Sequence, residues 1–406
     1  MINQFGSRFA LKEEIHDFGK TVNLREDSIA AAGLPLMSEG DNITVCDNDS
    51  HNLIIGGTGS KKNRLLLFLT VYLLAKRGES ICIFDPKGET YRRTASFMKS
   101  SGYNVRVLDF RNLGYGDYWN PLRYAYELYK TGNTNKAQEL ISDFITTLSD
   151  TQRNVTNDMF WVYMSCSFAT GILMLMLECA DEDEMNVKTF GQLCSGAVTD
   201  ELELLVEKIP KNSIAGINLS STCNCPERTK QSIYASLFAM VSVFLNQQAL
   251  TDVLSNSTFE FEELTEKKSA LFLITPDEKD TYNFVVSLAV KQLYEVLIET
   301  AQKSENLSLN TRFNFILDEF CNVPVINNFN SMISAARSRN IRFFIAIQSL
   351  NQLSAKYGDD QAQNIIGNCS NIAYLYSREM PLLKMISELC GERYLSDGRQ
   401  IPLITT

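Results

Sequence analysis

The chain has 406 residues, of which 45% are hydrophobic, and this is enough for a large core divided between two structural domains. Its net charge of −10 argues against a generally basic nucleic-acid coat, although a local basic channel is compatible with that charge. Two histidines and ten scattered cysteines argue against a Cys/His zinc cluster or a Ser-His-Asp triad, and they predict reduced, mostly buried thiols.

Residues 1–50 are mixed and polar and contain no long periodic segment. From residue 51 the chain alternates short apolar runs with segments of helix length, and such strands pair in parallel, so we expect an α/β sheet. The predicted strands cover 52–57, 79–86 and 104–110, and the predicted helices cover 60–78 and 90–102.

The pattern becomes mostly helical over residues 122–256, which predicts an all-helical insertion within the α/β domain. This segment contains an uncharged run, 159–177, that is close to the lower length limit of a membrane span. Small and polar residues dilute the run, and an acidic segment follows it, so we expect a buried helix. A membrane span through this run is the alternative.

Strands and helices alternate again from residue 257 to the end of the chain. The predicted strands cover 269–276, 312–320, 341–349 and 371–377, and the predicted helices cover 280–304 and 329–340. We therefore divide the chain into an N-terminal segment (1–50), a first part of the α/β domain (51–121), an inserted all-α domain (122–256) and a second part of the α/β domain (257–406).

The segment GGTGSKKN joins the first predicted strand to its helix and is similar to a phosphate-binding P-loop. Glycines allow backbone N–H groups to wrap phosphate oxygens at a helix N-terminus, where the helix dipole favours anions. Lys62 takes the position of the phosphate-binding lysine. The candidate nucleotide-binding residues are Gly56, Gly57, Thr58, Gly59, Ser60, Lys61, Lys62 and Asn63.

Two positions depart from the strict P-loop motif. Lys61 replaces the second glycine, so its β-carbon should crowd the phosphate or strain the loop. Asn63 replaces the Ser/Thr hydroxyl that binds Mg²⁺ and offers an amide oxygen, which is a weaker ligand in this geometry. We expect a loop of nucleotide-binding ancestry, with a glycine-rich turn that holds no ligand as the alternative, and ATP hydrolysis stays open.

The apolar run FNFIL ends in two carboxylates, Asp318 and Glu319. A carboxylate at the carboxyl end of a buried strand can bind Mg²⁺, and the next one can polarise an attacking water. Asp318 is therefore the candidate metal ligand and Glu319 a candidate catalytic residue. In DPKGE, Asp85, Lys87 and Glu89 lie near the phosphates or at a subunit interface, or Asp85 and Gly88 simply stabilise a turn; the sequence leaves both open.

Together the ordered motifs over roughly residues 50–395 resemble the type IV secretion coupling proteins, the TraG/TraD-like conjugative DNA-transfer ATPases. The segments that carry the resemblance are GGTGSKK, IFDPKGETYRRTASFMKSSGYNVRVLDF, WNPL, LITPDEKDTYNFVVSLAVKQLYEVL, ILDEFCNVPVINNFNSMISAARSRNI and AIQSLNQLSAKYGDDQAQNIIGNCSNIAYLYS. The helical insertion matches least by motif.

The resemblance implies a RecA-like P-loop NTPase domain with an inserted all-α domain, the cofactors ATP and Mg²⁺, and homo-hexameric rings at the cytoplasmic face of the cell membrane. It implies delivery of relaxase-bound DNA, without sequence preference, to the other components of a type IV secretion channel. By position, Arg337 resembles the trans-acting arginine finger of the family and Gln348 its γ-phosphate sensor. The solvated face of a helix is the alternative for Arg337.

Family members usually carry N-terminal membrane helices, and residues 1–50 contain none. We therefore expect that such helices, and sequence after IPLITT, were trimmed from this chain, or that it is a soluble variant or is tethered by a partner. The leading hypothesis is a coupling ATPase that moves DNA. The alternative is a docking platform that needs no nucleotide, or a non-hydrolysing ring subunit with a decayed P-loop.

Overall fold

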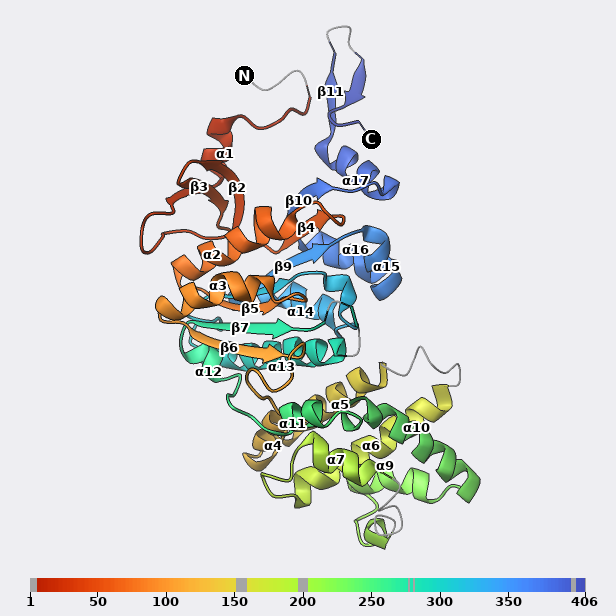
Figure 1. Ribbon diagram of the computed structural model, residues 1–406. Coiled ribbons are helices and arrows are strands. Elements are labelled where there is room, and N and C mark those ends of the chain that lie inside the picture. Colours follow the sequence, from red (N-terminus) through yellow and green to blue (C-terminus); the bar gives the residue numbers. More distant parts are fainter. Residues whose placement is uncertain are drawn as a thin grey trace.

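A computed structural model describes residues 6–150, 159–195, 204–276, 278–279, 282–395 and 399–405. Residues 1–5 of the N-terminal segment and residues 280 and 281 of the predicted helix 280–304 lie outside these ranges. The centre of the molecule is a parallel sheet of seven strands in the order β10-β4-β9-β8-β5-β7-β6 (Figure 1).

Every strand of this sheet comes from one of the apolar runs of the sequence. The strands are β4 (Asn52–Gly56), β5 (Ser80–Phe84), β6 (Asn104–Asp109), β7 (Ser269–Ile274), β8 (Phe313–Leu317), β9 (Ile341–Ile347) and β10 (Asn371–Tyr376). Because side chains alternate along a strand, Ile54 packs on one face of the sheet and its neighbours Leu53 and Ile55 pack on the other.

Helices cover both faces of the sheet, and each face has its own hydrophobic core. One face carries α2 (Phe68–Arg77) and α3 (Glu89–Ser100) together with the N-terminal strands. The other carries α13 (Asn283–Lys303), α14 (Phe329–Ala336), α15 (Leu350–Tyr357) and α16 (Asp359–Asn368), and its core continues into the helical insert.

The helical insert is a separate block beside α13 (Figure 1). Its described helices are α4 (Arg123–Lys130), α5 (Thr134–Asp150), α6 (Met159–Cys179), α7 (Val187–Cys194), α9 (Ile214–Cys223), α10 (Glu227–Leu245) and α11 (Gln248–Ser255). In the described part of the chain, α6 alone is long and apolar enough to span a membrane by itself, while α10 and α11 pass that test only as a pair bent by 86°. Of the most apolar window of α6, 61% is buried inside the insert, as expected of a core helix.

The chain enters and leaves the insert at adjacent points. Trp119 N donates to the carbonyl of Val253 at 3.0 Å, and Thr258 N donates to the carbonyl of Tyr118 at 3.1 Å. The two crossing segments therefore lie side by side, and the α12 turn (Glu263–Glu266) leads from them into β7.

Short strands that the sequence pattern does not reveal lie at both ends of the chain. Residues before β4 form α1 (Lys12–Phe18) and an antiparallel sheet of β1 (Lys20–Asn23), β2 (Leu34–Glu39) and β3 (Asn42–Cys46). After β10 follow α17 (Met380–Cys390) and a hairpin of β11 (Glu392–Tyr394) and β12 (Gln400–Pro402). Ser7 N donates to the carbonyl of Glu392 at 2.7 Å, so the two end regions are in contact.

Candidate nucleotide-binding site

The glycine-rich loop follows β4 and opens a helix, as the P-loop pattern predicts. The helix starts with a π-helical turn, η1 (Asn63–Leu67), before it becomes the regular helix α2. A β-carbon at Gly56 would lie 2.5 Å from Ser60 Oγ, so this position needs glycine. Lys61 adopts a left-handed φ of +64°, which is the strain expected where the motif has a glycine.

Lys62 points into the sheet edge and is 8% exposed. Its Nζ donates to the carbonyl of Ile347, at the end of β9, at 3.4 Å. Burial lowers the pKa of Lys62, and the nearby carboxylates of Asp318 and Glu319 oppose that shift. The ammonium group is therefore held in a dry site, where the charge of a phosphate would stabilise it.

Asp318 lies at the end of β8 and is 7% exposed. One carboxylate oxygen accepts from Asn63 Nδ2 at 2.8 Å, and the other accepts from Glu319 N at 3.0 Å. Burial raises the pKa of Asp318 to about 6, against the opposing effect of Lys62. The structure thus joins the P-loop directly to the acidic strand end.

Glu319 also has a left-handed backbone, with φ of +50°. Its Oε2 accepts a hydrogen bond from Asn322 Nδ2 at 2.7 Å, in the short 3-10 helix η3 (Phe320–Asn322). Sequence reasoning missed Asn322, although an amide three residues after a candidate catalytic carboxylate is within reach of it. Asn322 fixes the direction in which the Glu319 carboxylate points.

Gln348 follows the end of β9 and reaches the same loop. Thr58 Oγ1 donates to Gln348 Oε1 at 3.4 Å, and Gly57 N donates to the carbonyl of Tyr376 at 2.8 Å. The loop is therefore held between the ends of β9 and β10, and Gln348 lies beside it.

Arg337 lies on the opposite side of the sheet from the P-loop, where the amino ends of the strands meet. It opens the 3-10 turn η4 (Arg337–Arg339) just before β9, its side chain is 60% exposed, and its Nε pairs with Asp49 Oδ2 at 2.9 Å. The structure does not bring Arg337 to the P-loop of its own chain, so any contact with a nucleotide would be made with a neighbouring subunit.

Asp85 follows β5 and is 2% exposed. It accepts from Tyr91 N at 2.9 Å in the first turn of α3, which follows Gly88 with its left-handed φ of +64°. This favours the turn-stabilising interpretation of Asp85. Burial raises its pKa, and the backbone donors of α3 oppose that shift. Lys87 and Glu89 flank Gly88 in the same turn.

The residues of this edge fit a nucleotide with a divalent cation. Ser60 Oγ is buried inside the loop without a hydrogen-bond partner, and Asp318 offers buried carboxylate oxygens. The Asn63 amide, turned by half a rotation, would present its oxygen beside Asp318. No cluster of three His, Cys, Asp or Glu residues that could hold a metal occurs among the described residues. A cation here would therefore take its other ligands from phosphate and water.

The family model for type IV secretory system conjugative DNA transfer matches residues 13–397 of the chain. The type IV secretion system-coupling protein VirD4 of Bartonella quintana (strain Toulouse) is 20% identical over 350 residues, which is 84% of this chain and 53% of that protein. Protein VirD4 of Rhizobium radiobacter is 21% identical over 352 residues, or 84% of this chain and 48% of that protein. The chain thus spans about half the length of these relatives.

The fold is similar to that of the plasmid coupling protein TrwB in complex with the non-hydrolysable ATP analogue ADPNP, with a TM-score of 0.69 and 14% identity. The superposition covers 99% of this chain and 88% of the TrwB chain. VirB4 of Thermoanaerobacter pseudethanolicus has a TM-score of 0.55 at 13% identity, with 90% and 89% of the two chains covered. These similarities confirm the predicted fold class, an α/β RecA-like domain with a helical insertion.

Proposed function

The chain belongs to the type IV secretory system conjugative DNA transfer family, and we propose that it is the ATP-driven motor that passes relaxase-bound DNA to a secretion channel. The observation that carries this proposal is the hydrogen bond from Asn63 Nδ2 to Asp318 Oδ2 at 2.8 Å, which joins the P-loop to the acidic strand end. TrwB, which shares the fold, has been solved with ATP and GTP analogues and with ADP and Mg²⁺.

In this proposal each residue of the carboxyl-terminal edge has one task. The N–H groups of residues 57–62 and the ammonium of Lys62 bind the phosphates, and Asp318 with Asn63 holds Mg²⁺, which neutralises phosphate charge when bound. Glu319 orients and polarises the attacking water, and Gln348 senses the γ-phosphate beside Thr58. Arg337 of a neighbouring subunit completes the site in a homo-hexameric ring.

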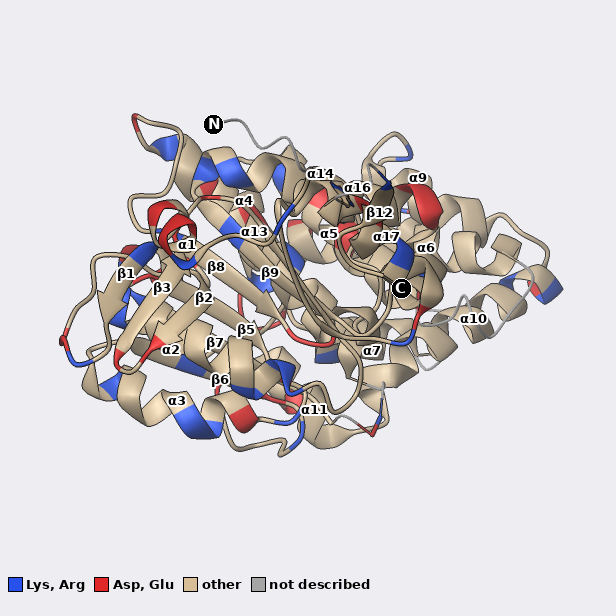
Figure 2. Ribbon diagram, turned by 90° about the horizontal axis from the view of Figure 1, so that it is seen from above, with Lys and Arg blue, Asp and Glu red and all other residues tan. Residues whose placement is uncertain are grey.

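DNA would bind through its phosphates in the channel of that ring, at the cytoplasmic face of the membrane and next to other secretion components. Basic and acidic residues are interspersed along the ribbon in the view of Figure 2. We therefore expect the affinity for DNA to depend on ring assembly and on salt concentration, and to be independent of the DNA sequence.

The first test is a calorimetric titration of the chain with ADPNP, carried out with and without Mg²⁺. We expect binding that Mg²⁺ strengthens and that Lys62→Ala weakens by about 100-fold, because a buried charge-assisted contact is lost. Lys76→Ala is the matched control, since Lys76 lies outside the loop and donates to the carbonyl of Leu24. A chain that binds no nucleotide at millimolar concentration would refute the proposal.

Two departures from the P-loop motif favour a second candidate, a docking platform or a non-hydrolysing ring subunit. Lys61 strains the loop, and Asn63 lacks the hydroxyl that usually binds Mg²⁺. The double variant Lys61→Gly/Asn63→Thr separates the two candidates through steady-state ATPase assays. A gain of about 100-fold or more would show that the natural loop limits hydrolysis, whereas equal, measurable activity in both proteins would favour the motor.

A further inference from the structure

Helix α13 contacts the segment that follows the two carboxylates, residues 320–328, which we call the carboxylate loop. Three polar side chains of α13, spaced four residues apart, face this loop, and each donates to one of its backbone carbonyls. The three pairs are Asn283 Nδ2 with Asn322 O at 2.9 Å, Ser287 Oγ with Pro324 O at 2.9 Å, and Lys291 Nζ with Asn327 O at 3.3 Å.

At one end, this contact reaches the candidate catalytic carboxylate. Asn283 of α13 holds the backbone of Asn322, and the side chain of Asn322 donates to Glu319 Oε2 at 2.7 Å. The position of α13 therefore sets where Asn322 lies, and Asn322 sets the direction of the Glu319 carboxylate.

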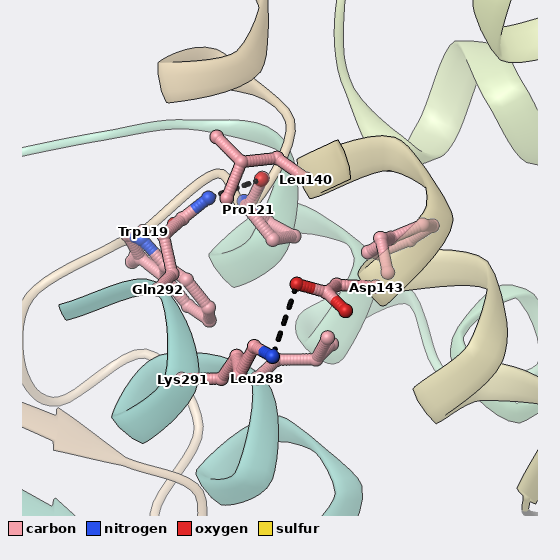
Figure 3. Close-up of a pocket in the computed structure, with 8 residues that line it drawn as sticks. Trp119, Pro121, Leu140, Asp143, Leu288, Lys291 and Gln292 are labelled. Atoms are coloured by element: carbon pink, nitrogen blue, oxygen red, sulfur yellow. Dashed lines mark hydrogen bonds and ion pairs between the residues drawn. The ribbon is translucent and has the colours of Figure 1, made fainter. Parts of the chain in front are cut away.

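At the other end, α13 contacts the helical insert. Lys291 Nζ also pairs with Asp143 Oδ2 of α5 at 3.3 Å, and the Lys291 side chain is only 9% exposed. Figure 3 shows this pair at a cavity of about 20 Å³ that Trp119 and Leu140 also line. One buried ammonium thus holds both the carboxylate loop and the insert, and loss of its ion pair with Asp143 would leave charge in this interface without its partner.

We propose that α13 couples the nucleotide site to the helical insert, with Asn322 as a positioning residue for Glu319 and Lys291 as the junction to Asp143. The proposal rests on the proposed nucleotide-binding function, because occupancy of the site is its input. Coupling between two sites is reciprocal, so a partner that moves the insert also changes the affinity for nucleotide.

The insert offers a matched control at the same helix pair. Lys136 of α5 pairs with Glu295 of α13 at 2.6 Å, and its other partner is Glu139 of its own helix. Lys291→Met and Lys136→Met therefore each remove an ammonium from the α5–α13 interface, but only Lys291 also donates to the carboxylate loop.

Hydrogen exchange of the α5 amides, measured with and without ADPNP and Mg²⁺, tests the coupling. We expect nucleotide to change α5 exchange by about threefold or more in the natural chain and in Lys136→Met, and to have no such effect in Lys291→Met. Lys291→Arg, which keeps charge and donor, should restore it. If Lys291→Met keeps the response, or if the natural chain binds ADPNP without one, the inference is overturned.

A second arm needs no nucleotide and separates this inference from the proposed function. In the nucleotide-free chain, Asp143→Asn should speed exchange in the carboxylate loop by about threefold, and Lys136→Met should leave it unchanged. Equal exchange in the two variants would refute the coupling even if nucleotide binds. A chain that binds no ADPNP but shows the Asp143→Asn effect would refute the proposed function and keep only the mechanical link between the carboxylate loop and the insert.

The positioning role of Asn322 has its own readout. Asn322→Ala should lower the rate constant of ATP turnover by about tenfold and leave the Kd of ADPNP within about twofold, since Asn322 orients Glu319 and lies outside the phosphate loop. Asn322→Gln retains the amide and should recover part of the rate. Parallel loss of affinity and turnover would indicate a merely structural role and contradict the assignment.

Discussion

The amino ends of the parallel strands meet on one side of the sheet, the amino-terminal edge, and their carboxyl ends meet on the other, the carboxyl-terminal edge. Buried charge is paired differently at these two edges. At the amino-terminal edge Arg342, only 1% exposed, donates to Glu79 Oε2 at 3.0 Å and to Asn314 Oδ1 at 2.9 Å. At the carboxyl-terminal edge the buried Lys62 contacts a backbone carbonyl, and Asp318 accepts hydrogen bonds from neutral donors. Charge at the first edge is satisfied inside the protein, whereas the proposed function requires the charge at the second edge to be available to a ligand.

The largest expected effect comes from removing the central charge of the amino-terminal edge. Arg342→Met should lower the free energy of unfolding by about 3–5 kcal/mol, because the buried Glu79 carboxylate would lose its nearest cation and keep only its longer pairs with Arg312 and Arg77. Urea unfolding measures this loss, with Lys62→Met at the other edge as the control. We expect the control to change stability by less than about 1 kcal/mol. Equal losses of unfolding free energy in Arg342→Met and Lys62→Met would show that the two edges do not differ in how much buried charge contributes to stability.

The amino-terminal edge should also make stability depend on pH. His51 Nδ1 accepts from Phe343 N at 3.0 Å, its Nε2 faces the carbonyl of Ile333 at 2.8 Å, and burial lowers its pKa from 6.5 to about 4. The unfolded chain takes up this proton near pH 6.5 and the folded chain only near pH 4. The contribution of neutral His51 to the free energy of unfolding is therefore complete above pH 6.5. It is lost as pH falls toward 4, by up to about 3 kcal/mol.

Unfolding of the natural chain and of His51→Gln between pH 7.5 and 4.5 checks the sign of this effect. The Gln variant keeps a donor and an acceptor but has no proton to gain, so its stability should fall less steeply in this range. Parallel curves would show that other groups cause the acid sensitivity.

Arg337 is the expected exception at the amino-terminal edge. Arg337→Ala should lower ATP turnover by about tenfold or more, because a neighbouring site loses its transition-state charge, while stability changes by less than about 0.5 kcal/mol for an exposed pair. ATPase assays on mixtures with Lys62→Ala subunits should recover activity, since each variant supplies what the other lacks. Unchanged ATP turnover would indicate that Arg337 is simply part of the solvated face of its helix.

A small effect on stability, without one on partner subunits, is expected in the strained loop of the carboxyl-terminal edge. Lys61→Gly should raise stability by about 1 kcal/mol, because glycine adopts a φ of +64° without the clash of a β-carbon. Gly59→Ala, at a φ of +82° with open space around it, should shift stability by a similar amount in the opposite direction. Thermal unfolding of both variants measures this, and changes of the same sign would exclude backbone strain as the cause.

The sequence predicts the central sheet well, because strands buried on both faces are continuous apolar runs such as the one that becomes β8 (Phe313–Leu317). It also predicts that Lys62, Asp318 and Gln348 meet, since the carboxyl ends of parallel strands share one edge. The N-terminal sheet escapes prediction because strands such as β1 (Lys20–Asn23) are short and largely polar.

Details within the site depend on contacts that periodicity does not encode. The hydrogen bond of Asn63 to Asp318 joins residues 255 positions apart in the sequence, and no periodic pattern marks the π-helical turn Asn63–Leu67. The α13 contacts do leave a trace in the sequence. Polar residues recur every four positions, at Asn283, Ser287 and Lys291, on a helix that is otherwise mostly apolar there, and this spacing indicates a shared partner.

The adjacent crossing of the chain at Trp119 and Thr258 has an evolutionary consequence. A module whose entry and exit points already touch can be lengthened, shortened or exchanged while the host strands keep their register, because closing the gap needs only a short turn. The α/β domain and its helical insert can therefore diverge at different rates, and the host sheet should accept an insert taken from another chain.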